Sequence, residues 1–183
     1  MDAREKVGTH DPPARPLARP CRRRTVLHRP ADNITEIPEG QLEQALDNAY
    51  ENASLLGSHK DVACVLTGIN CGSVFLSVLQ ADTDPGPDTA PWDEAAETTL
   101  DAPTGGLRYN ALMGNTGEDP QTPYETNLAH AGPGQYQLRL HARGRSINPD
   151  GVQDQDEPIT EHYLLQVWPS LSPRSASTRA PAS

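Results

Sequence analysis

The chain has 183 residues, of which 35% are hydrophobic, 18 are proline and 14 are glycine. This length suits one domain with a hydrophobic core, and the low apolar content indicates flexible ends around a compact centre. Residues 1–30 hold eight basic and three acidic residues, hence +5, so the net charge of −10 leaves −15 on residues 31–183. A body this acidic repels nucleic acid and anionic membranes, whereas it suits a basic partner or serves solubility alone.

The sequence contains no recognisable targeting or spanning segment. No apolar run of about 7–15 residues follows the basic start, as a secretory signal would require. No stretch approaches the roughly 18 apolar residues of a membrane span. A cytoplasmic location is therefore the expectation.

Residues 1–37 are predicted to be a disordered basic tail. Its prolines break any helix, and its apolar residues have no period. A nucleic-acid-binding arm is the alternative interpretation, but the segment lacks interleaved aromatic residues and is joined to an acidic body.

A helix is predicted over residues 38–57. Pro38 suits its first turn and Gly57 suits its end. The apolar residues recur at the spacing of one helical stripe, which predicts packing against the domain. This stripe consists of Leu42, Ala45, Leu46, Ala49, Tyr50 and Ala53.

From Val62 the apolar period becomes two, which is typical of strands. The clearest strand is 135–143, and the last is 161–168; on each, one face is apolar and predicts core packing. The remaining candidates are 62–67 and 73–80, joined as a hairpin, then 107–113 and 124–128, while 92–100 fits either a strand or a short helix. The predicted class is mainly β: a small antiparallel β-sandwich or barrel-like domain over 38–169, with one N-terminal amphipathic helix and a disordered Ser/Pro/Ala-rich tail over 170–183.

Two segments near the C-terminus suggest a family. The stretch GQYQLRLHARGR (134–145), followed by EHYLLQVWP (161–169), resembles a motif of small, uncharacterised bacterial proteins with a β-sandwich-like fold. That resemblance implies the same fold and brings no catalytic residues. The layout is also faintly similar to the competence-protein-J nuclease inhibitors, and this similarity implies binding to a nuclease in place of its substrate.

One candidate site is a basic stripe. Arg139, His141 and Arg143 alternate along one strand and share a face, and Arg145 extends the stripe. Guanidinium groups bind carboxylate and phosphate, so the stripe is a candidate anion site. The alternative is an exposed face whose arginines pair with acids on neighbouring strands, such as Glu125 or Glu161.

A second candidate is the acidic loop 146–157. Calcium-binding loops take oxygen ligands from positions 1, 3, 5, 7, 9 and 12, with glycine at position 6. Gly151 occupies that glycine position, but the first position is a serine and the flanks are predicted strands rather than helices. The alternative is a solvated hairpin end. The candidate ligands are Ser146, Asn148, Asp150, the Val152 carbonyl, Asp154 and Glu157.

Signatures of common enzymes are missing. The sequence has no G-x-S-x-G, P-loop, H-E-x-x-H or G-x-G-x-x-G motif. The leading hypothesis is therefore a non-catalytic acidic binding module, such as an inhibitor or immunity-type protein for a basic partner like a nuclease. A calcium-binding β-domain and an enzyme with an unrecognised site are the alternatives. No cofactor other than calcium, no nucleic acid and no membrane is expected.

Overall fold

The structure is a computed structural model that describes residues 15–16, 24–28, 40–111, 127–154 and 156–170. Its elements are β1 (Arg15–Pro16), β2 (Arg24–His28), α1 (Gln41–Glu51), β3 (Leu56–His59), β4 (Val62–Leu66), β5 (Phe75–Gln80), β6 (Glu94–Ala102), β7 (Arg108–Ala111), β8 (Gly134–Arg143) and β9 (His162–Pro169).

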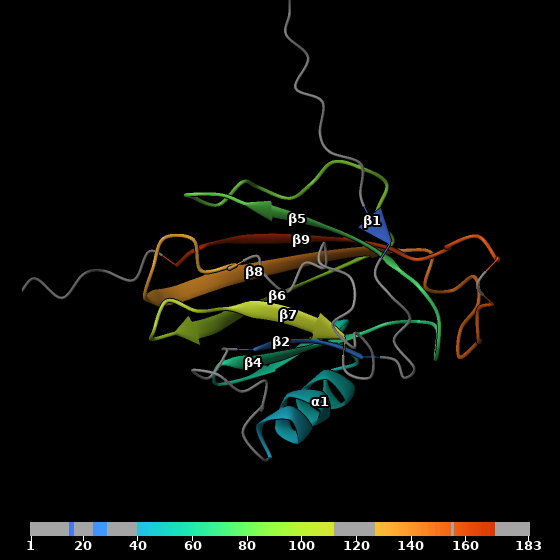
Figure 1. The fold of residues 1–183 in the computed structure, drawn as a ribbon, viewed down its shortest axis with the longest axis horizontal. Helices are drawn as coiled ribbons and strands as arrows, with labels where there is room; N and C mark the ends of the chain where they lie inside the picture. The colour runs from blue at the N-terminus through green and yellow to red at the C-terminus, as the bar shows by residue number, and fades with distance from the viewer. Residues whose placement is uncertain (1–14, 17–23, 29–39, 112–126, 155, 171–183) are drawn as a thin grey trace, which may run out of the picture.

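The elements form three layers, with two sheets and one helix (Figure 1). One sheet has five strands in the order β1-β5-β9-β8-β6, and the other has four in the order β3-β4-β2-β7. Helix α1 packs against β3 and β4 on the outer side of the four-stranded sheet. The prediction of a mainly β fold with one helix is confirmed, and the two sheets do not close into a barrel.

Strand β4 explains why three layers form. All five of its residues are buried, because one face meets the helix and the other meets the five-stranded sheet. Val62, Cys64 and Leu66 pack with Ala45 and Leu46 of α1, while Ala63 and Val65 join the larger core between the sheets. The apolar run 62–67 therefore belongs to a strand covered on both faces.

Helix α1 is shorter than the predicted 38–57. It ends at Glu51, and Ala53 follows in a left-handed conformation with φ 47°. The predicted stripe is confirmed for its buried residues Ala45, Leu46 and Ala49, but Tyr50 and Ala53 are exposed. Ala53 lies beyond the end of the helix, which contacts β3 and β4 through the side that carries Ala45 and Ala49.

Gly57, predicted to end the helix, instead lies in β3 under α1. A Cβ atom there would overlap the Ala45 carbonyl oxygen and the Ala49 backbone nitrogen. Glycine is therefore used at this position because two backbones approach closely. A helical period ending in glycine does not distinguish this use from a helix stop.

The predicted hairpin between 62–67 and 73–80 is wrong. Strand β4 lies in the four-stranded sheet and β5 lies in the five-stranded sheet, where it runs parallel to β9. The hairpin partner of β4 is β3, through the turn at Lys60, whose φ is 53°. The five-stranded sheet is therefore mixed rather than wholly antiparallel, because β5 and β9 run in the same direction.

Strands β8 and β9 confirm the clearest sequence predictions. They pair antiparallel with Leu138 opposite Val167 and Leu140 opposite Leu165. The alternate residues of both strands on this face are buried in the core between the sheets: Tyr136, Leu138, Leu140, Ala142, Tyr163, Leu165 and Val167.

The N-terminal segment differs from the predicted disordered tail at two places. Residues 24–28 form β2, which pairs with β4 on one side and β7 on the other. Residues 15–16 form β1, which pairs with β5. The short run Thr25-Val26-Leu27 is rich in strand-forming residues, and the two sheet edges supply its partners. The rest of residues 1–37, and residues 171–183, lie outside the described residues.

Candidate functional site

The basic stripe lies on the face of β8 that points away from the core between the sheets. Arg139 and His141 are nevertheless 7% and 3% exposed, so the alternative of an exposed face is wrong for both. Residues 82–91, here called the strap, connect β5 to β6 and contact this face through Asp84, Gly86 and Asp88. The strap therefore makes a nominally outer face of the sheet partly buried.

The guanidinium group of Arg139 is hydrogen-bonded to three side chains. Its Nη1 donates to Asp84 Oδ1 at 3.0 Å and its Nη2 to Asp84 Oδ2 at 3.4 Å, while its Nε donates to Glu97. Nη1 also donates to Gln166 Oε1 at 3.3 Å, and the guanidinium lies 4.8 Å from the ring centroid of Trp168. The Arg139 hydrogen bond, followed by the Gly86 N–H, holds the pKa of Asp84 below its usual value.

His141 and Arg143 are gathered around Trp92. The ring centroids of His141 and Trp92 are 5.7 Å apart, and the Arg143 guanidinium lies 5.4 Å from the indole centroid. The Asp88 N–H points at His141 Nε2 from 3.5 Å. The Ala90 N–H and the nearby Trp92 and His141 side chains lower the pKa of Asp88.

Arg145 leaves the stripe. It follows Gly144, whose φ is 81°, and its Nη1 pairs with Glu94 on β6. The structure thus brings Arg139, His141 and Arg143 together on one face and places Arg145 at the sheet corner. The expected pairing with acids on neighbouring elements occurs, but through Asp84, Glu97 and Glu94; Glu125 lies outside the described residues.

Glu161 has a different role from the predicted strand-pairing acid. Its side chain is fully buried, and its Oε1 accepts the Ile69 N–H at 2.6 Å. Its Oε2 accepts the Gly68 N–H at 3.0 Å and the Tyr163 hydroxyl at 2.5 Å. Burial first, and then the negative charge of Glu161, raises the pKa of Tyr163. This carboxylate fixes the turn after β4 to the start of β9.

The acidic loop 146–157 is hydrogen-bonded to that same turn. The Asn70 N–H donates to the Gly151 carbonyl at 2.8 Å, and the Asp150 N–H donates to the Gly68 carbonyl at 2.9 Å. Gln153, 7% exposed, accepts the Ser73 N–H at 2.9 Å and donates to the Pro158 carbonyl at 2.6 Å. Sequence reasoning missed Gln153, which joins the loop to the domain.

The six candidate calcium ligands are distributed along this loop in different roles. Val152 forms a β-bridge with Cys71, and Asp150 has a left-handed φ of 61°. Glu157 turns back into its own loop, where its Oε2 accepts the Asp154 N–H at 3.0 Å. Ser146 and Asp154 are exposed, and Asn148 is half-buried.

Within the described ranges, no three His, Cys, Asp or Glu side chains are grouped so that they could hold a metal ion. Calcium binding stays a prediction.

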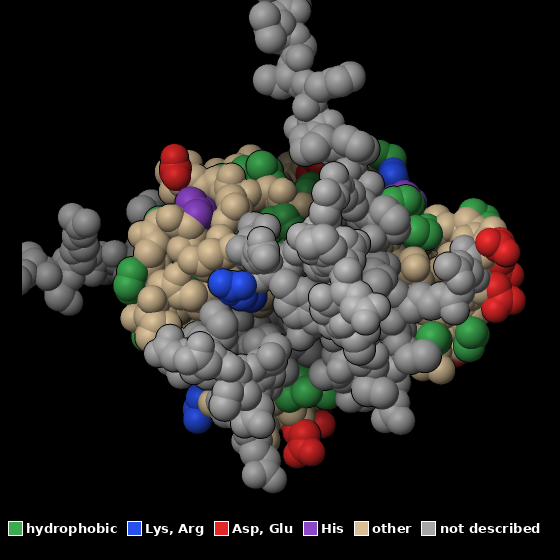
Figure 2. Space-filling view, viewed as in Figure 1, with side chains coloured by type: hydrophobic (Ala, Val, Ile, Leu, Met, Phe, Trp, Pro, Cys, Tyr) green, Lys and Arg blue, Asp and Glu red, His purple; other side chains and the backbone are tan. Residues whose placement is uncertain are grey.

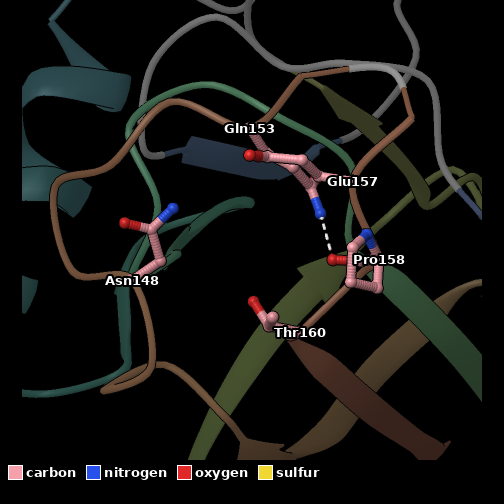
Figure 3. A pocket seen from close by; sticks show the side chains of 5 residues that line it. All are labelled: Asn148, Gln153, Glu157, Pro158 and Thr160. Atoms are coloured by element: carbon pink, nitrogen blue, oxygen red, sulfur yellow. Dashed lines mark hydrogen bonds between the residues drawn. The ribbon is translucent and has the colours of Figure 1, made fainter.

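A shallow pocket of about 220 Å³ lies inside this loop. In Figure 3, Gln153 and Glu157 lie on one side of it, Asn148 on another, and Thr160 on the side of the sheet. Its lining offers two amides, one carboxylate and one hydroxyl. None of the residues that line this pocket belongs to the basic stripe.

Comparison with known proteins defines what the fold resembles. A protein described as "Crocagin biosynthetic gene J" is similar over 85% of this chain and 94% of its own, with 13% identity and a TM-score of 0.50. ComJ from Bacillus subtilis, described as an inhibitor of the DNA degrading activity of NucA, matches 85% of this chain and 95% of its own, with 8% identity and a TM-score of 0.48. No protein-family model and no curated protein sequence matches the chain.

The first of these structures shows a shared fold. The similarity to competence-protein-J inhibitors that the layout predicts is confirmed as a distant one.

Acidic side chains dominate the exposed charge. Over the described residues there are sixteen Asp and Glu against seven Lys and Arg, a net charge of −9. Figure 2 shows acidic side chains over α1 and over the loop between β8 and β9. On α1 the acids Glu43, Asp47 and Glu51 form one exposed stripe. In the part of the chain that the structure covers, no helix is long and apolar enough to cross a membrane.

Proposed function

We propose that this chain is a non-catalytic binding module that uses its acidic surface to hold a basic protein, in the manner of an inhibitor or immunity protein. The observation that carries the proposal is how the described charges are distributed. Arg139 and Arg145 are paired with carboxylates of the same domain, whereas the carboxylates on α1 face solvent. The surface presented to a partner is therefore negative.

The acidic stripe on α1 supports the proposal because its like charges destabilise the helix. Glu43, Asp47 and Glu51 are spaced four residues apart, and like charges at this spacing destabilise a helix by about 0.2–0.5 kcal/mol per pair. No basic residue lies in the last turn of the helix to balance them. A basic partner would offset this repulsion.

A nuclease is the partner class that we favour. Enzymes that bind nucleic acid present basic surfaces to the phosphates, so an acidic protein can occupy such a surface and exclude the substrate. The large negative charge of residues 31–183 would also speed the encounter with such a partner.

Binding and inhibition can be measured together with the full chain and a purified basic nuclease from the same genome. We expect a complex that blocks DNA cleavage. Exposed charges are screened beyond about 10 Å at roughly 0.1 M salt, so the dissociation constant should rise at least about tenfold between roughly 0.05 and 0.3 M NaCl. Binding that does not depend on salt, or no binding to any such nuclease, would overturn the proposal.

Two matched triple variants locate the contact. One is Glu43→Gln with Asp47→Asn and Glu51→Gln on α1; the other is Asp154→Asn with Asp156→Asn and Glu157→Gln in the loop. Each removes three negative charges, so a difference between them reports position and not net charge. At least one should weaken binding about tenfold, which corresponds to about 1.4 kcal/mol. If both bind as the unaltered chain does, the acidic surface is not what the partner recognises.

A further inference from the structure

In the described part of the chain, the strap is attached to the five-stranded sheet by backbone hydrogen bonds only at its two ends. Backbone hydrogen bonds fix its two ends, from the Ala81 N–H to the Val167 carbonyl and from the Asp93 N–H to the Ala142 carbonyl, both at 2.9 Å. Between them, no backbone-to-backbone hydrogen bond joins the described residues 82–91 to a strand; the bond from the Trp92 N–H to the Ala90 carbonyl, at 2.8 Å, is local. Pro85, Pro87 and Pro91 have no N–H with which to form one. The middle of the strap is therefore held by contacts that involve side chains.

Those contacts converge on the basic stripe. Asp84 accepts two hydrogen bonds from Arg139, and the Gly86 carbonyl accepts the Gln166 amide at 3.2 Å. Gln166, which is 3% exposed, also accepts from Arg139 and lies 3.3 Å from His141 Nε2. Beneath the strap there is thus a built polar site with a buried guanidinium, a buried amide and a buried imidazole.

Asp84 occupies that site as a ligand would. Its two oxygens face the two Nη atoms of one guanidinium, which is the planar pairing that arginine makes with a carboxylate. Its side chain is 55% exposed although that of Arg139 is 8% exposed, so the carboxylate enters the site from solvent. The rest of the strap is largely exposed.

We propose that the basic stripe is a carboxylate-binding site centred on Arg139, and that Asp84 of the strap keeps this site occupied. An acidic peptide segment of a partner can take the place of Asp84. The Arg139 fork and the Gln166 amide would hold the incoming carboxylate. Arg143, half-buried beside Trp92, would add a second positive charge. An internal ligand lowers the apparent affinity for an external one by the fraction of time it vacates the site.

The acidity of the whole chain does not prevent such binding. Charges separated by more than a Debye length, about 10 Å at 0.1 M salt, are largely screened. With Asp84 displaced, the ion pair between Arg139 and Glu97 remains, and the Nη1 and Nη2 donors of Arg139 lose the carboxylate that they bind. A carboxylate from a partner supplies the acceptors that these two donors need.

The test uses the two tryptophans as reporters. The chain has two, and the rings of both lie within 5.4 Å of a stripe guanidinium, Trp168 beside Arg139 and Trp92 beside Arg143. A capped hexa-aspartate peptide is titrated into the full chain at about 0.1 M NaCl and the intrinsic fluorescence is followed. Asp84→Asn keeps the shape of the side chain and an acceptor for the Gly86 N–H, so this variant should fold.

We expect Asp84→Asn to bind the peptide at least tenfold more tightly than the unaltered chain. Asp82→Asn is the matched control, since it removes the same charge from the same strap at a side chain that is 98% exposed and does not contact Arg139. Adding Arg143→Gln to Asp84→Asn should abolish the gain. Equal binding by the Asp82 and Asp84 variants would overturn the proposal, as would binding of inorganic phosphate but not of the peptide.

Discussion

Glu161 shows how a single buried acid can hold two strands in place. Its carboxylate accepts two backbone N–H groups and one hydroxyl, from Gly68, Ile69 and Tyr163. Glu161→Gln replaces one of these acceptor oxygens with an NH₂ group that faces donors. Leaving a buried donor unsatisfied costs about 1–3 kcal/mol, so we expect the free energy of unfolding, measured with urea, to fall by that amount.

The control for this variant is Glu157→Gln, because Glu157 is exposed and accepts one hydrogen bond from its own loop. It should change stability by less than about 0.5 kcal/mol. If the two variants unfold at the same urea concentration, Glu161 does not have the role assigned to it.

Because Tyr109 is buried, we expect the stability of the fold to depend on pH in the alkaline range. Burial raises the pKa of this phenol from 10.0 to about 12. Between these values the unfolded chain releases the proton and the folded chain retains it, so the contribution to stability is complete below pH 10 and is lost as the pH approaches 12. Tyr109→Phe cannot ionise and should lose less stability between pH 8 and pH 11. Identical pH profiles in urea unfolding would contradict this assignment.

At the scale of elements, the contact between α1 and β3 depends on Gly57. Gly57→Ala would place a methyl group against the helix backbone, which must then move. Overpacking typically costs about 1–3 kcal/mol, and we expect at least this loss in thermal unfolding. Gly134→Ala is the control, since nothing lies within 4 Å of a Cβ atom at that position. A Gly57 variant as stable as the Gly134 variant would show that α1 is not tightly seated.

At the scale of the whole molecule, β2 determines where the domain begins. The sequence predicts a domain over 38–169, but β2 lies between β4 and β7 in the four-stranded sheet. Removing residues 1–37 would remove β2 from between β4 and β7 and β1 from the edge of β5, so three strand edges would be exposed. Exposed strand edges invite aggregation, and the lost pairing lowers stability. We therefore expect a chain that begins at residue 38 to melt at a lower temperature than the full chain.

Removing residues 171–183 is the matched truncation, because it leaves every described strand intact. It should leave the melting temperature unchanged. If the chain that begins at residue 38 is equally stable, the domain begins there, as the sequence predicts, and β2 contributes little.

Part of this architecture can be predicted from local sequence patterns. The alternation in β8 and β9 correctly predicts that Leu138, Leu140 and Leu165 are buried, and the helical period correctly predicts Ala45 and Leu46. These predictions succeed because a period of two or of 3.6 residues is set by the backbone geometry of each element. The acidic charge of the body and its lack of common catalytic motifs are also properties of the sequence itself.

Only the tertiary structure decided what lies over each face and beside each edge. Arg139 and His141 alternate along β8 as exposed residues do, yet the strap covers them. The sequence patterns of β4 and β5 are typical of a hairpin, yet the two strands lie in different sheets. The bonds from Glu161 to Gly68 and Ile69 span more than 90 residues. The period of the apolar residues indicates which residues of one helix or strand share a face. The direction in which two strands pair, and the segment that covers a given face, depend on parts of the chain that are distant in sequence. No local pattern encodes them.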